Sequence, residues 1–346
     1  AIAKLGFVQA DPIRAPARAQ DLTLRHRVVD YRAGDLERRY PRLAIEEDFF
    51  VNYGFVPRAT HALMHPRAAR KDWPRARRAR AEAILEFVAA RGVVHPREVD
   101  AAFEHGTTRN WFGGKSRAST QLLDEMHYRG LLRVARREGG TRLYAPLHAH
   151  AREAPADPDA AFDALIDVAV AKYAPLPAAT LSRLVLWVGS AAAPQWRDRR
   201  GAALARAKAR LPHAEIEGCG WDWPDGETPG ARRFARDDVL DENLRLLAPF
   251  DPVVWDRDRF ARFWGWAYRF EAYTPAPKRV RGYYALPMLW RGLAIGWATA
   301  TLRDGRLDVS TGYVAGQAPR DAAFDVALAE ERTRLAGFLG LTAAAP

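Results

Sequence analysis

The sequence predicts an α+β protein built from several small units. Three observations carry this prediction. The chain has 346 residues, more than one hydrophobic core usually organises. Two stretches, 75–146 and 157–247, each show helical apolar spacing followed by a hairpin pattern. Residues 281–313 instead alternate like neighbouring strands. We therefore expect helical units first and a β-rich end.

The clearest pattern lies between residues 75 and 146. Three helices are expected, at Arg78–Arg91, Pro96–Phe103 and Ser116–Tyr128. A hairpin is expected after them, with strands at 131–137 and 141–144 around the turn Glu138-Gly139-Gly140. Three helices followed by a hairpin is the element order of a winged helix.

A second unit of the same kind is expected between residues 157 and 247. Its helices are predicted at Ala161–Tyr173, Ala178–Trp187 and Arg199–Leu211, and its wing between Ala214 and Phe234 with the tip at 223–230. The Ala- and Pro-rich segment His148–Pro158 reads as the linker between the two units.

The C-terminal part is predicted to be a β-meander closed by a helix. The turn signals are Arg291-Gly292 and Asp304-Gly305, and the second is a strong hairpin signal. Strands are expected at Arg281–Trp290, Leu293–Leu302 and Arg306–Tyr313, and an amphipathic helix at Pro319–Leu339.

The charge of the chain indicates a polyanionic partner. The formal net charge is +11, and each phosphate that a cation neutralises releases condensed counterions. Nucleic acid fits better than a membrane, since the sequence shows neither a run of about 18 apolar residues nor a leader peptide. The single cysteine, Cys219, excludes an internal disulfide and a cysteine metal cluster, which is consistent with the cytoplasm. We expect no cofactor, no metal and a monomer.

Gln9 and Asp11 are the candidate catalytic residues. They lie two residues apart at the end of the apolar run Leu5–Val8, so in an extended segment both side chains project to one side. A carboxylate accepts protons and an amide both donates and accepts hydrogen bonds, so the pair suits a bound water. The structural alternative is that Asp11-Pro12 only forms a turn.

Two further blocks give the chain a recognisable likeness. They are Leu246–Arg259, which contains Pro-Phe-Asp-Pro-Val-Val-Trp-Asp-Arg, and Tyr273–Pro287, which contains Lys-Arg-Val-Arg-Gly-Tyr-Tyr. Together with Gln-x-Asp and Ala17-Arg18-Ala19, they resemble the bacterial interstrand-crosslink DNA glycosylases, the YcaQ (AlkX) and AlkZ family, from about Leu5 to about residue 315.

The resemblance implies tandem winged-helix units followed by a β-rich domain with a closing helix. The expected domains are 1–74, 75–150, 151–247 and 248–346. The first would be a winged unit without its opening helix, although Leu22–Val29 and Asp35–Tyr40 still look helical.

The resemblance also implies excision of N7-alkylated or interstrand-crosslinked purines from double-stranded DNA. Asp11 would accept the proton of the attacking water, and Gln9 would orient that water or the lesion. Such a base leaves as a neutral alkylpurine, so one carboxylate suffices without a general acid. Only Lys4 lies near the motif in the sequence, so we expect a monofunctional enzyme and no Schiff-base lyase.

Four cations are the candidate DNA contacts: Arg14, Arg18, Lys278 and Arg279. Arg18 stands in the matching Ala-Arg-Ala, and its alternative is a solvated arginine or an internal ion pair. Lys278 and Arg279 enter the meander, where they grip phosphate or pack against the acidic residues Asp251, Asp256 and Asp258.

Other patterns carry less weight. His61 and His65 have helical spacing, but a zinc site needs more ligands, so a DNA-facing or surface role is expected. Lys115–Arg117 would precede or open a third helix, the groove-reading position of a winged-helix regulator. Val51 stands where the family usually has His. The competing function is a non-enzymatic winged-helix DNA-binding protein or transcriptional regulator.

Overall fold

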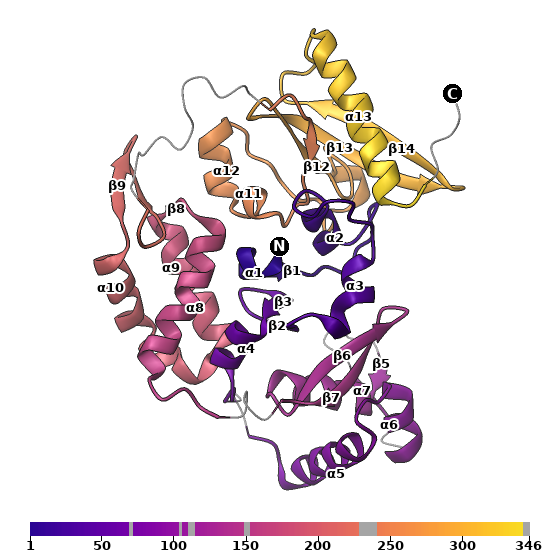
Figure 1. Cartoon of the computed structure of the whole chain (residues 1–346), viewed down its shortest axis with the longest axis vertical. Helices are drawn as coiled ribbons and strands as arrows, with labels where there is room; N and C mark the ends of the chain where they lie inside the picture. The colour runs from indigo at the N-terminus through magenta and orange to yellow at the C-terminus, as the bar shows by residue number, and fades with distance from the viewer. Residues whose placement is uncertain (69–71, 104–105, 110–114, 149–152, 228–240, 342–346) are drawn as a thin grey trace.

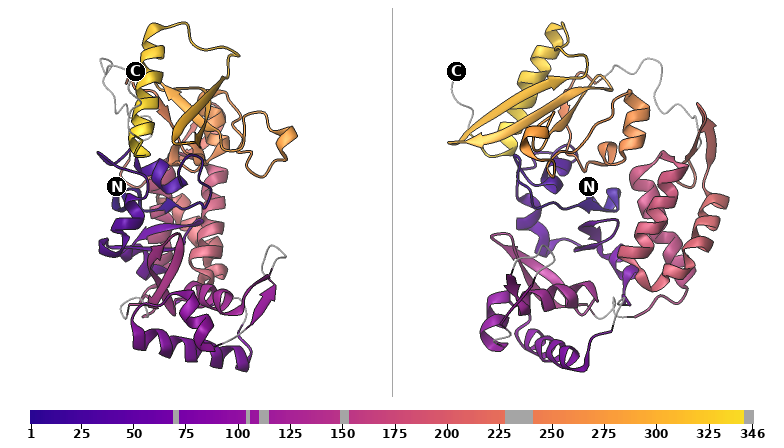
Figure 2. Two further views of the ribbon diagram at one scale, coloured as in Figure 1. Left: turned by 90° about the vertical axis from the view of Figure 1, so that its right-hand side faces the viewer. Right: turned by 180° about the vertical axis from the view of Figure 1, so that it is seen from behind.

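The computed structural model describes residues 1–68, 72–103, 106–109, 115–148, 153–227 and 241–341. Helices and small antiparallel sheets alternate along the chain, which agrees with the expected α+β class. The N-terminal elements lie at the centre, and the other three parts of the chain surround them (Figure 1). The views from the side and from behind show the same arrangement (Figure 2).

The central part contains a three-stranded sheet of order β1-β3-β2. Gln9 in β1 pairs with Gly54 in β3. A Cβ at Gly54 would lie 2.3 Å from the carbonyl oxygen of Val8, so only glycine allows the two strands to approach this closely. The helix expected at 22–29 lies earlier, and the one expected at 35–40 is present. The elements are α1 Ile2–Leu5, β1 Val8–Gln9, α2 Ala19–Leu24, α3 Asp35–Arg39, β2 Ile45–Phe49, β3 Tyr53–Pro57 and α4 Arg58–Met64.

The next part has the three expected helices and the expected hairpin, plus a short hairpin that the sequence did not predict. Residues 115–117 form a strand rather than the start of the third helix, because they pair with 107–109. The elements are α5 Arg75–Arg91, α6 Pro96–Phe103, β4 Thr107–Arg109, β5 Lys115–Arg117, α7 Ala118–Tyr128, β6 Leu132–Glu138 and β7 Thr141–Pro146.

The following part is helical with a hairpin at its end. The hairpin turns at Glu217 and Gly218, whose φ angles are 52° and 68°, and not at 223–230 as expected. The rest of the predicted wing, 228–234, lies outside the described residues. The elements are α8 Pro158–Tyr173, β8 Leu176–Pro177, α9 Ala178–Trp187, the π-helical turn Val188–Ala192, the 3₁₀ turn Pro194–Arg199, α10 Arg200–Arg210, β9 His213–Ile216 and β10 Cys219–Asp222.

The C-terminal part forms the expected meander, a sheet of order β11-β12-β13-β14 covered by a helix. Its strand at 281–290 begins only at Leu286, because the buried Glu271 carboxylate accepts the backbone amides of Arg281 and Gly282 that a strand would use. The elements are β11 Arg245–Leu246, α11 Pro252–Trp255, α12 Arg257–Trp264, the 3₁₀ turn Ala276–Lys278, β12 Leu286–Trp290, β13 Leu293–Arg303, β14 Arg306–Tyr313 and α13 Ala322–Phe338.

The N-terminal segment contributes to three separate hydrophobic cores. Phe7 packs with α8 to α10, Val8 packs with the part around α5 and α7, and Leu22 packs with the C-terminal sheet and α13. Because of this shared packing, the position of β1 depends on all the surrounding parts. Within the described residues, no helix combines the length and apolar composition that a membrane span requires.

Candidate active site

Gln9 opens onto a cavity of about 500 Å³. The residue ends β1, and its side chain is almost completely buried. Its side-chain oxygen Oε1 has no hydrogen-bond partner within the described residues. A buried acceptor without a partner is costly, so this oxygen has an unused capacity to accept a hydrogen bond.

Three distant segments line this space, which we call the Gln9 cavity. Val51 and Asn52 follow β2, close to Gln9. Arg183 and Trp187 come from α9, and the block from Phe250 to Asp258 supplies the remaining side. Val51, at the position where related sequences were expected to carry His, makes this side of the cavity apolar.

The block at 250–258 is held by two helix caps. Asp251 accepts the amide of Val253 at the start of α11, and Pro252 occupies the first helical position. Asp256 accepts the amides of Asp258 and Arg259 at the start of α12. Both carboxylates therefore shape the backbone, and this explains why the block needs aspartate at these two spacings.

Asp11 lies beyond Gln9 and is 8% exposed. Its Oδ1 accepts the backbone amide of Ile13 at 2.8 Å, the turn interaction that the sequence left open as an alternative. Its Oδ2 has no hydrogen-bond partner among the described residues. Burial raises the pKa of Asp11, against the Ile13 hydrogen bond, which lowers it. A raised pKa makes the ionised carboxylate a better proton acceptor.

Gln9 and Asp11 do not face the cavity equally. Gln9 lines it, whereas Asp11 is not part of its lining. Asp11 is instead near Tyr284, whose pKa is raised well above 10.0 by burial and, to a smaller degree, by the charge of Asp11. The expectation that both side chains meet one ligand therefore depends on the free Oδ2 of Asp11 reaching the cavity edge.

A buried lysine lies beside β1, and no pattern in the sequence indicated it. Lys172 in α8 donates a hydrogen bond from Nζ to the backbone carbonyl of Phe7. Burial lowers its pKa to about 7. Lys4 is therefore not the only lysine near the motif among the described residues, as was expected from the sequence, because helix packing brings Lys172 to Phe7. Lys172 is 7% exposed and is not part of the cavity lining.

The four candidate DNA contacts differ in their surroundings. Arg14 and Lys278 are exposed and have no ion-pair partner among the described residues. Arg18 pairs with Glu37 at 2.6 Å, the internal ion pair that was the alternative for this residue. Arg279 donates to the carbonyl of Thr274 and lies over the Tyr283 ring.

The acidic residues of the 250–258 block have other partners than these cations. Asp251 pairs with Arg27, while Asp256 and Asp258 face Arg183. Within the described residues, no ion pair joins Lys278 or Arg279 to these carboxylates. Binding of DNA phosphate is therefore the role of Lys278 and Arg279 to test.

The aromatic residues of the two C-terminal motifs are partly core and partly exposed. Trp266 and Tyr284 are buried, whereas Tyr283 is 44% exposed. Trp255 is only partly buried and lines the cavity.

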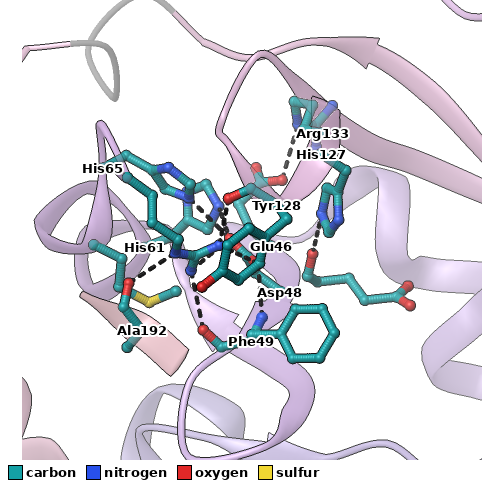
Figure 3. Close-up of polar contacts among 12 residues, drawn as sticks. Glu46, Asp48, Phe49, His61, His65, His127, Tyr128, Arg133 and Ala192 are labelled. Atoms are coloured by element: carbon teal, nitrogen blue, oxygen red, sulfur yellow. Dashed lines mark hydrogen bonds and ion pairs between the residues drawn. The ribbon is translucent and has the colours of Figure 1, made fainter. Parts of the chain in front are cut away.

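His61 and His65 are buried around Asp48 (Figure 3). Their Nε2 atoms lie 3.1 and 2.8 Å from Asp48 Oδ2. The expected surface or DNA-facing role was therefore wrong. Arg67 binds both oxygens of the same carboxylate, at 3.0 and 3.3 Å. Arg67 also donates to the carbonyls of Phe49, Tyr128 and Ala192, so the cluster joins three parts of the chain.

The donor atoms of Asp48, His61 and His65 lie within 4.8 Å of one another, the spacing of a metal site. Arg67 occupies the same carboxylate, so a metal ion would compete with a buried guanidinium. Burial acts to raise the pKa of Asp48, but Arg67 and the two histidines hold it well below its usual range. Burial lowers the pKa of His65 to about 4, so its ring is neutral at pH 7. The arrangement fits a neutral His65 that donates to a carboxylate already paired with Arg67.

Comparison with known proteins identifies the family. The family model described as "DNA glycosylase AlkZ-like" matches residues 2–338, nearly the whole chain. The chain belongs to the AlkZ-like DNA glycosylase family. It is accordingly an enzyme of the DNA glycosylase class that acts on DNA.

A solved structure shows the same fold. The chain is similar to the DNA glycosylase AlkZ of Streptomyces sahachiroi, with a TM-score of 0.59 and 17% sequence identity over 98% of this chain and 90% of that one. At this identity the likeness concerns the mixed α/β fold of the AlkZ-like family. The division of the chain into winged-helix units is still an interpretation.

Proposed function

We propose that this AlkZ-like protein is a monofunctional glycosylase that excises N7-alkylated purines, including those of interstrand crosslinks, from double-stranded DNA. The observation that carries the proposal is the Gln9 side chain, which lines the cavity, has a buried Oε1 without a partner among the described residues, and lies two residues before the Asp11 carboxylate. The site lies on a protein of net charge +11, which suits a duplex partner.

The chemistry required of the protein is small. N7 alkylation places a positive charge on the purine, so the glycosidic bond breaks with the base leaving as a neutral alkylpurine. The sugar then develops oxocarbenium character, and water adds at C1′. A carboxylate near C1′ both stabilises the developing cation and takes the proton of the water.

Asp11 and Gln9 divide these tasks. The Oδ2 atom of Asp11 accepts the proton, while Oδ1 stays bonded to the Ile13 amide and fixes the side chain. Gln9 Oε1 accepts a hydrogen bond from the same water and orients it. The strand pairing of Gln9 with Gly54 holds the amide in place.

The test is base release from duplex DNA that contains 7-methylguanine. Wild type is expected to release the free base, identified by mass, and to leave an alkali-labile abasic site. Asp11→Asn is expected to lose release, because the amide keeps the Ile13 hydrogen bond but accepts no proton. Gln9→Ala is expected to slow release strongly.

The matched control is Asp30→Asn. Asp30 is exposed with φ 54°, a conformation that asparagine adopts equally well, so this variant should act like wild type. Equal release by wild type and Asp11→Asn would refute the mechanism. Sequence-specific binding to one operator without base release would instead favour a regulator.

A further inference from the structure

The Gln9 cavity has an aromatic wall. Trp255 stacks on Tyr173 with ring centroids 4.0 Å apart, and Trp187 meets Trp255 edge-on at 5.5 Å. Trp187 is 36% exposed, an unusual position for such a large apolar ring. The stack fixes the orientation of Trp255, so the wall presents rigid ring surface to the cavity.

The formal charges of the residues that line the cavity sum to zero. Arg183 and Arg257 oppose Asp256 and Asp258, so the lining is neutral in a protein of net charge +11. The guanidinium of Arg257 is already bonded within the protein, because it donates to the carbonyls of Val254 and Pro249. A neutral aromatic cavity suits a base rather than a phosphate.

A cation already lies on this wall. The guanidinium carbon of Arg183 is 5.7 Å from the centroid of the Trp187 ring. The same guanidinium faces Asp256 at 3.5 Å and Asp258 at 3.6 Å, distances longer than those of tight ion pairs. Its Nε is buried without a hydrogen-bond partner among the described residues. Arg183 is therefore held by a hydrogen bond from Nη2 to Oγ1 of Thr180 at 2.9 Å, by a ring face and by two long carboxylate contacts.

We propose that Trp187, with Asp258 beside it, binds the positively charged ring of the alkylated purine, and that Arg183 competes with the base for this place. The proposal rests on the proposed function and names the residues that select its substrate. When a cationic purine displaces Arg183, one planar cation takes the place of another. The purine then makes the contact with the Trp187 ring and the interaction with the carboxylates that Arg183 gives up. A neutral purine also displaces Arg183 but does not replace its cation–π contact or its attraction to the carboxylates, so undamaged bases bind less well.

The test uses nucleosides, which carry no phosphate and so separate base recognition from DNA affinity. The cationic form of 7-methylguanosine is titrated against the whole protein by ligand-observed NMR, with guanosine as the neutral control. Wild type is expected to bind 7-methylguanosine more tightly. Trp187→Leu should weaken that binding about fivefold, the size of one partly desolvated cation–π contact.

Changes at Arg183 should act in the opposite direction. Arg183→Met removes the competing cation and should strengthen 7-methylguanosine binding about threefold, at the lower end of one cation–π contact. Arg183→Lys, which keeps the charge, should stay near wild type. Asp258→Asn should weaken binding, and Trp187→Phe, which keeps a ring, should restore most of what Trp187→Leu loses. Guanosine binding should change little in Asp258→Asn and Arg183→Lys, but should also strengthen in Arg183→Met, because no cation has to be displaced.

Three results would overturn the proposal: equal binding of the two nucleosides, weaker or unchanged binding of 7-methylguanosine in Arg183→Met, or no effect of Trp187→Leu in a folded protein. Base release from 7-methylguanine DNA, measured on the same preparations, distinguishes the two proposals. Selective nucleoside binding without base release would refute the glycosylase mechanism alone. Base release without selective binding would refute only the role of Trp187 and Arg183.

Discussion

Arg27 and Asp251 form a two-point ion pair that joins the N-terminal part of the chain to the C-terminal part. Nη1 of Arg27 lies 2.7 Å from Oδ2 of Asp251, and Nη2 lies 2.9 Å from Oδ1. Asp251 is fully buried and also caps α11. The pair therefore holds the block at 250–258 against the segment that carries Gln9 and Asp11.

Replacing Arg27 by Met should destabilise the protein strongly. The change leaves the Asp251 carboxylate buried and without its cation, which costs about 3 kcal/mol of unfolding free energy. Chemical denaturation measures the loss. Arg38→Met is the control, because its ion pair with Asp35 is exposed and should contribute less than about 1 kcal/mol. Equal losses in the two variants would contradict this account.

The rate of base release should fall in acid with a midpoint above the usual range of an aspartate. Asp11 must be ionised to accept a proton, and burial raises its pKa, so activity is present above that pKa and lost as the pH falls through it. Single-turnover rates across pH measure the midpoint. Circular dichroism at each pH must show folded protein. A rate independent of pH in this range would exclude Asp11 as the base.

No covalent intermediate should form between the enzyme and DNA. Lys172 is the lysine that packing brings to β1, but its Nζ is buried and bonded to the Phe7 carbonyl, so it does not reach C1′. Borohydride added during the reaction should trap no protein–DNA adduct. An adduct that is absent in Lys172→Met would show that the enzyme is a lyase and that Lys172 is its nucleophile.

Stability should decline between about pH 6.5 and pH 4 because of His65. Its folded-state pKa is about 4, below the ordinary histidine value of 6.5, so the folded state binds fewer protons and stability is retained above pH 6.5. The loss on acidification is on the order of 3 kcal/mol. His65→Gln, which can still donate to Asp48, should flatten the dependence in denaturation curves. Parallel curves for the two proteins would contradict this role.

The exposed cations should contribute more to DNA affinity than the paired one. Lys278→Ala should lower affinity for duplexes of any sequence and reduce the slope of log affinity against log salt by about one. Arg18→Ala should change both quantities less, because Glu37 already neutralises this guanidinium. Fluorescence anisotropy at several salt concentrations measures them. A larger effect at Arg18 would show that DNA displaces Glu37.

Local patterns predicted most of the regular elements. The helix Ala178–Trp187 was predicted with the bounds that the structure shows, and the hairpin at Asp304-Gly305 turns where expected, with φ angles of 48° and 74°. Both depend on neighbouring residues only. The strand expected from residue 281 does not form there, because the Glu271 carboxylate, ten residues earlier, accepts the backbone amide of Arg281. The prediction of a surface or DNA-facing role for His61 and His65 was wrong, because the fold places Asp48 and Arg67, which lie in other segments of the chain, beside them.

The sequence by itself determined the composition of the site: an amide and a carboxylate two residues apart, an acidic and aromatic block far downstream, and a positive net charge. Only the tertiary structure decided which of them meet. It placed Gln9 on the cavity, bonded one oxygen of Asp11 to Ile13, and brought Trp187 and Arg183 from α9 to the same space. The physical reason is that strand and helix periodicity are local, whereas burial and ion pairing join residues that the chain separates by more than a hundred positions.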